Sequence, residues 1–128
     1  MAKEKAESKA QKLLQEYRPI AWRKSALEAV PGMSQDVLQA CVTQMKLTQA
    51  LVDILRKSIP MGEKLYWITY ITYMTEQQPG GVYEILDLIA KNHEPIPRRT
   101  YFRLKNRAIS ILDSSLVEMA KESAPPGI

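Results

Sequence analysis

The chain contains one cysteine and one histidine among its 128 residues, and each scarcity excludes a class of site. Because Cys41 is alone, no disulfide can form within the chain, and a reducing cytoplasm is the simplest expectation. A zinc site needs several Cys or His ligands, so we expect neither His93 nor any other residue to bind a metal. No histidine neighbours Cys41 to activate it, and we interpret it as a small apolar helix residue.

Long apolar runs and catalytic motifs are also missing. No stretch approaches the roughly 20 residues of a membrane-spanning helix, so we expect no contact with a membrane. The first residues are rich in lysine, but no apolar signal-peptide core follows them. Paired carboxylates at a plausible spacing, a Ser/His/Asp set and a phosphate-binding glycine loop are all absent. We therefore expect a protein that is not an enzyme and that needs no cofactor.

The composition is typical of a single packed domain with tails. Hydrophobic residues make up 45% of the chain, and the formal net charge is +4 at pH 7. The isoelectric point near 9.2 favours an anionic partner such as nucleic acid.

The first half of the chain is predicted to be helical in three pieces, with an all-α fold overall. Residues 3–17 are rich in good helix formers but have little apolar face, so their start is expected to fray. Pro19 is expected to interrupt the helix before a short amphipathic segment at 20–30. After a Pro-Gly break, Ser34 is a candidate N-cap for a helix over residues 35–57.

Residues 65–74 allow two interpretations. Their β-branched and aromatic content favours a strand. Their spacing favours a helix, because Trp67, Tyr70 and Tyr73 recur every three residues and not every two. We predict a buried helix. The aromatic row would then pack in the core, although such a row can also stack nucleotide bases.

The next elements are predicted from their breakers. Residues 77–81 form a loop, residues 82–92 a short helix and residues 92–95 a turn. Pro97 is expected in the first turn of a last helix that continues to about Lys121, since the missing N–H of a proline costs nothing there.

The start of this last helix is basic on one side only. Five cations without an acid among them occupy ten residues: Arg98, Arg99, Arg103, Lys105 and Arg107. At about 100° per residue, an apolar face unites Tyr101, Leu104, Ala108, Ile111, Leu112 and Ser115. The opposite face carries Arg99, Phe102, Arg103, Asn106 and Ser110. Arginine and asparagine are the residues that read guanine and adenine edges in a major groove.

A short helix, a brief turn and a basic amphipathic helix make the pattern of a helix-turn-helix over residues 82–112. The helix at 61–75 would complete a tri-helical core, in which we expect Trp67, Tyr70, Ile85, Ile89, Tyr101 and Leu104 to meet. The alternative is a helical bundle whose last helix is basic only for solubility. Two features favour DNA binding over this alternative. The cations lack acid partners four residues away, and an outward Phe102 would be costly to expose without a partner.

We therefore expect Arg99, Phe102, Arg103 and Asn106 to approach base edges. The flanking cations, Arg98, Lys105 and Arg107, are expected to contact phosphates.

Three segments together resemble the ArpU-type transcriptional regulators of phages and prophages: Leu65-Tyr-Trp-Ile-Thr-Tyr-Ile-Thr-Tyr73, Ile85-Leu-Asp-Leu-Ile89 and Ile96-Pro-Arg-Arg-Thr-Tyr-Phe-Arg-Leu-Lys-Asn-Arg-Ala-Ile109. The Arg-Arg-Thr-Tyr-Phe-Arg run is similar to the Arg-Arg-Thr-Tyr-Tyr signature of that family. More distantly, residues 59–116 resemble region 4 of sigma factors. The resemblance covers the C-terminal half. Pro95-Ile-Pro97 departs from it, since a glycine followed by a capping Ser or Thr is usual there.

The resemblance implies a sigma region 4-like helix-turn-helix that regulates late phage genes in the cytoplasm of a bacterial host. The expected organisation is a basic N-terminal helix at 1–19, a helical region at 20–59, the DNA-binding unit at 60–121 and a tail at 122–128. The function predicted is sequence-specific binding of double-stranded DNA to regulate transcription. The alternative is a phage assembly or packaging adaptor that works through helix-mediated protein contacts.

A homodimer and RNA polymerase are further expected partners. One helix-turn-helix reads only a few base pairs, so two copies would gain selectivity. The apolar stripe of residues 35–57 is broader than a tri-helical core needs. We predict a dimer built from residues 20–57 and centred on Leu38, Met45, Leu51 and Leu55.

Overall fold

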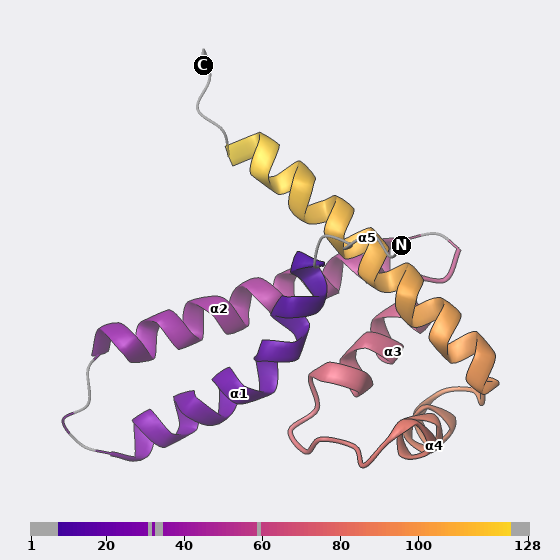
Figure 1. Cartoon of the computed structure of the whole chain (residues 1–128), viewed down its shortest axis with the longest axis horizontal. Helices are drawn as coiled ribbons and strands as arrows, with labels where there is room; N and C mark the ends of the chain where they lie inside the picture. The colour runs from indigo at the N-terminus through magenta and orange to yellow at the C-terminus, as the bar shows by residue number, and fades with distance from the viewer. Residues whose placement is uncertain (1–7, 31, 33–34, 59, 124–128) are drawn as a thin grey trace, which may run out of the picture.

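The computed structural model describes residues 8–30, 32, 35–58 and 60–123, and within these ranges it contains helices and no strand (Figure 1). The all-α prediction is confirmed. The elements in chain order are α1 (Lys9–Ala29), α2 (Gln35–Asp53), the 3-10 turn η1 (Ile54–Lys57), α3 (Gly62–Tyr73), α4 (Val82–Asn92) and α5 (Arg98–Ser123). Among the described residues, no helix is both long and apolar enough to span a membrane.

The predicted break at Pro19 is wrong, because α1 continues through it as one helix. A proline inside a helix removes one backbone hydrogen bond and pushes the carbonyl of the preceding turn aside, which bends the helix. Figure 1 shows that the axis of α1 changes direction along its length. Ser8 is the N-cap of α1, and its side chain accepts a hydrogen bond from the Gln11 N–H at 3.0 Å. The N-cap predicted at Ser34 lies outside the described residues, as do the first seven residues and the last five.

One hydrophobic core joins the two halves of the chain. Its fully buried side chains come from α1, α2, η1, α3 and α5: Leu14, Leu51, Leu55, Leu65, Ile68, Tyr101, Leu104 and Leu112. The C-terminal end of α2 therefore packs into the core of the C-terminal half, whereas the helix as a whole packs mainly against α1. The predicted dimer surface is wrong at Leu51 and Leu55, which are 0% exposed within the single chain. Met45 is half-buried against the same core, and Leu38 is half-buried.

The helix predicted over residues 65–74 is confirmed by α3. Its aromatic row is only partly in the core, because Trp67 and Tyr70 are half-buried. The rings contact one another, with 5.7 Å between the centroids of Trp67 and Tyr70. The Arg56 guanidinium lies 3.8 Å from the centroid of the Tyr66 ring. Groups of the protein itself thus cover the faces of the α3 rings, which favours packing over base stacking as the role of these aromatic residues.

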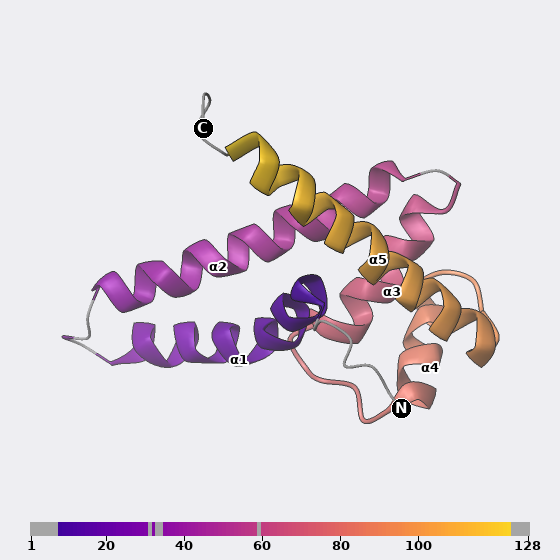
Figure 2. The ribbon, with the colours of Figure 1, turned by 45° about the horizontal axis from the view of Figure 1, so that its top comes forward.

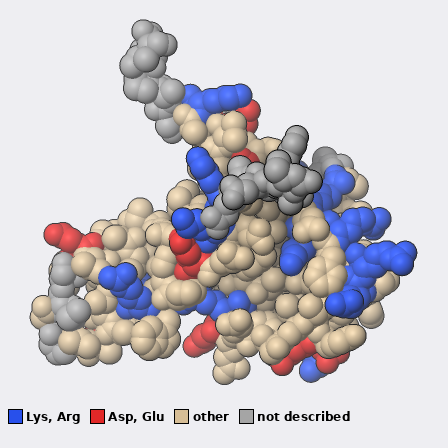
Figure 3. Space-filling view, viewed as in Figure 1, with Lys and Arg blue, Asp and Glu red and all other residues tan. Residues whose placement is uncertain are grey.

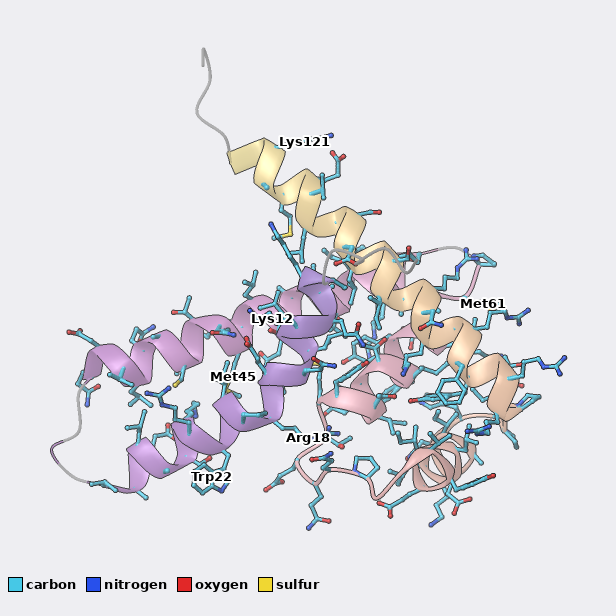
Figure 4. All side chains as sticks on the ribbon, in the orientation of Figure 1. Lys12, Arg18, Trp22, Met45, Met61 and Lys121 are labelled. Carbon is cyan, nitrogen blue, oxygen red and sulfur yellow. The ribbon has the colours of Figure 1, made fainter. Side chains whose placement is uncertain are left out.

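Polar side chains tie the middle and the start of α1 to the C-terminal half. Arg18 donates hydrogen bonds to the carbonyl oxygens of Thr72 and Thr75, both at 2.9 Å, where α3 ends (Figure 4). At the start of α1, the carboxylate of Asp113 on α5 accepts hydrogen bonds from the Ser8 hydroxyl at 2.7 Å and from the Ala10 N–H at 2.9 Å. The negative charge of a carboxylate at a helix N-terminus also interacts favourably with the positive end of the helix dipole. The Arg18 contacts thus fix α1 relative to α3, and the Asp113 contacts fix it relative to α5.

Candidate nucleic-acid interface

The basic segment begins α5, which packs against α3 and α4 (Figure 2). Side chains of all three helices enter the shared core, among them Ile68, Ile85, Ile89, Tyr101 and Leu104. The bounds predicted for α4 are confirmed, and residues 93–97 connect it to α5. Pro97 lies just before α5 instead of in its first turn, and its carbonyl accepts the Tyr101 N–H at 2.9 Å.

The two faces predicted for α5 differ in burial as expected. On the inner side Tyr101, Leu104, Ala108 and Leu112 are at most 2% exposed. On the outer side Arg99, Arg103, Asn106 and Ser110 are exposed. We refer to the outer side that carries Arg99, Arg103 and Asn106 as the basic face. Its orientation is therefore fixed by a row of fully buried residues on the same helix.

The cations of this segment gather on one side of the molecule (Figure 3). Within the described part of the chain, none of Arg98, Arg99, Arg103, Lys105 and Arg107 forms an ion pair with a carboxylate. Cations elsewhere do form such pairs, for example Lys64 with Glu94 at 3.3 Å. The positive charge at the start of α5 is thus free to attract an anion.

Phe102 does not stand free on the basic face, contrary to the argument from the sequence. It is half-buried, it packs against the core, and its ring centroid lies 5.1 Å from that of Tyr101. The Arg98 guanidinium and the Lys105 ammonium each lie 5.2 Å from the centroid of the Phe102 ring. A cation over an aromatic face gains about 0.5–1 kcal/mol at an exposed site. Phe102 therefore holds the two flanking cations in place.

Tyr101 anchors the helix by a partly buried hydrogen bond. Its hydroxyl lies 2.8 Å from the hydroxyl of Thr72 on α3, which itself donates to the Ile68 carbonyl at 2.6 Å. Since the Thr72 proton is used for that carbonyl, the Tyr101 hydroxyl is the donor of the pair. Burial raises the pKa of the Tyr101 hydroxyl and keeps it protonated. This bond holds the rotation of α5 on which the basic face depends.

The turn before α5 is held by ring packing and an ion pair. The His93 ring lies 4.6 Å from the Trp67 ring, centroid to centroid, and Glu94 pairs with Lys64 of α3. The sequence interpretation missed these supports because their members are far apart in the chain. No group of His, Cys, Asp or Glu that could hold a metal is found in the described ranges.

The chain matches no protein-family model, no curated protein and no solved structure. The resemblance to ArpU-type regulators therefore stays a prediction, and the function must be argued from the geometry of α5 and its supports.

Proposed function

We propose that this protein binds double-stranded DNA in a sequence-specific manner and regulates transcription. One observation carries the proposal. The first part of α5 presents exposed arginine and asparagine side chains that have no carboxylate partner among the described residues, while its opposite face is buried in the core. A rigid helix with guanidinium and amide groups outward is the element that reads a major groove.

In this proposal α4 and α5 act as a helix-turn-helix, supported by α3. Arg99, Arg103 and Asn106 contact base edges. Two good hydrogen bonds from one arginine to guanine, or from one asparagine to adenine, contribute about 1–3 kcal/mol of discrimination.

The flanking cations Arg98, Lys105 and Arg107 contact phosphates and position α5 in the groove. In this proposal Phe102 does not read bases but supports the side chains of Arg98 and Lys105, because its half-buried ring lies against both cations. The resemblance to ArpU-type regulators extends the proposal to late genes of a phage or prophage, in the cytoplasm of a bacterial host, with RNA polymerase as a further partner.

Exposed aromatic residues support the adaptor as a second candidate. Trp22 on α1 is 75% exposed, and Tyr83 on α4 is 77% exposed. Large exposed aromatics are common where proteins contact one another. An adaptor would bind a phage assembly protein and no particular DNA sequence.

Selection from a random duplex library separates the two functions. We expect the full chain to enrich one sequence. Its affinity should fall as salt rises, with a log–log slope of about −3 if three phosphate contacts form. As a matched control, Arg23→Ala removes an exposed arginine near the far end of α1 and should leave both results unchanged. Failure to enrich any sequence would refute the regulator and leave the adaptor.

A further inference from the structure

The second half of α5 carries a groove on a different side from the basic face. This half of the helix extends beyond the other helices (Figure 1). The groove has a volume of about 580 Å³, and all but one of its lining residues belong to α5. Its described lining residues are Arg107, Ser110, Ile111, Ser114, Ser115, Glu118 and Met119 from α5 and Ile54 from η1, and Ser110 lies at the border with the basic face. We refer to this surface as the α5 groove.

The two ends of the α5 groove carry opposite charges. Arg107 and Glu118 are eleven residues apart, or about 16 Å along a helix, so they cannot pair within one chain. Arg107 makes no ion pair in the described ranges. Glu118 meets Lys121 at 3.6 Å, with both side chains more than 60% exposed. Such a surface pair contributes little and exchanges easily.

Between Arg107 and Glu118, the α5 side of the groove consists of small serines and of Ile111. Ile111 provides apolar contact, Met119 adds a further apolar contact beyond Glu118, and Ser114 is small and exposed. A small residue at the middle of a helix face lets a second helix approach closely. Arg107, Ile111, Ser114 and Glu118 are spaced by four, three and four residues, which is the seam spacing of paired helices.

From this pattern we infer that the α5 groove binds the α5 groove of a second copy of the chain, with the two helices antiparallel. A two-fold axis between residues 112 and 113 places Arg107 of each copy opposite Glu118 of the other. It also places Ile111 of each copy opposite Ser114. The pair of Arg107 and Glu118 then occurs twice in the interface, because a two-fold axis repeats every contact between the two chains.

The placement of the basic faces in this pair rests on the proposed function. Because Arg107 meets Glu118 in the pair, the phosphate contacts of a DNA-bound dimer come from Arg98 and Lys105. The basic face lies about 90° around α5 from the groove at 100° per residue. A two-fold perpendicular to both helices therefore leaves both basic faces on one side. Arg103, near the middle of the basic face, lies about 29 Å along the axis from Arg103 of the other copy, somewhat less than the spacing of about 34 Å between successive major grooves.

Sedimentation equilibrium of the full chain without DNA tests the inference. At a concentration on the order of 100 µM, we expect a species of twice 14.6 kDa. Arg107→Glu and Glu118→Arg should each weaken the dimer at least about tenfold, because like charges then meet twice. An equimolar mixture of the two variants should restore the dimer, because every pair between the two chains is again of opposite charge.

The controls separate association from folding and from DNA binding. Arg23→Glu and Asp87→Arg reverse exposed charges on α1 and α4 and should dimerise like the wild type. Ser114→Lys should weaken the dimer and Ser114→Ala should not, with unchanged helix content by circular dichroism for all. A monomeric wild type, single variants that dimerise normally, or a mixture that stays monomeric would each overturn the inference. A dimer that selects no DNA sequence would instead refute the proposed function alone.

Discussion

Truncation of Leu104 tests the rotation of α5, on which the basic face depends. Leu104 is 2% exposed and belongs to the core that joins α3, α4 and α5. Leu104→Ala removes three carbon atoms, worth about 0.8 kcal/mol each when buried. A cavity in a closely packed core adds to this loss, so we expect the free energy of unfolding to fall by about 2–5 kcal/mol. Urea denaturation followed by circular dichroism measures the change.

Val117→Ala is the matched control, since Val117 lies on the same helix and is 54% exposed. It should change the free energy of unfolding by less than about 0.5 kcal/mol. A neutral Leu104→Ala would mean that Leu104 faces solvent. The helix would then be rotated, and Arg99 and Arg103 would no longer share the outer face.

Three further predictions concern the supports of the basic face. Arg18→Met should lower the free energy of unfolding by about 1–3 kcal/mol, because it removes charged hydrogen bonds to the end of α3; in the same urea assay, Arg23→Met should be neutral. Burial raises the pKa of Tyr101 and of Tyr73, so the folded state favours their protonated forms. What the protonated tyrosines contribute to the free energy of unfolding is complete below about pH 10 and is lost as the pH rises through the folded-state pKa. Tyr101→Phe should therefore reduce the loss of stability at alkaline pH, measured by thermal melting at a series of pH values. Phe102→Ala should weaken binding to all DNA sequences to a similar degree by fluorescence anisotropy, and a loss confined to one sequence would return Phe102 to base reading.

The helices and the two faces of α5 could be predicted because their causes are local. Spacing along the chain marks the buried side of α5, and the period of three in residues 65–74 identifies a helix despite its strand-like composition. Breakers such as Pro79-Gly80-Gly81 set the start of α4. Each of these signals lies within about ten residues of the element that it defines.

The errors concern contacts between distant segments. A proline is expected to end a helix, yet α1 passes through Pro19. Its neighbour Arg18 bonds to α3, and Asp113 holds the start of α1. From the sequence, the apolar stripe of α2 predicts a dimer interface, but Leu51 and Leu55 fill the core of the same chain. A helical pattern shows that a face is apolar but does not show what covers it.

The most direct test of the central claim compares Arg103→Ala with the wild type on two duplexes. One is the sequence enriched by selection and the other is a scrambled version of it, at equal salt, with binding followed by fluorescence anisotropy. We expect the variant to lose about 1–3 kcal/mol of affinity on the enriched sequence and much less on the scrambled duplex. Arg98→Ala, in contrast, should weaken both duplexes about equally. An equal loss for Arg103→Ala on both duplexes would contradict the assignment of the basic face of α5 to base reading.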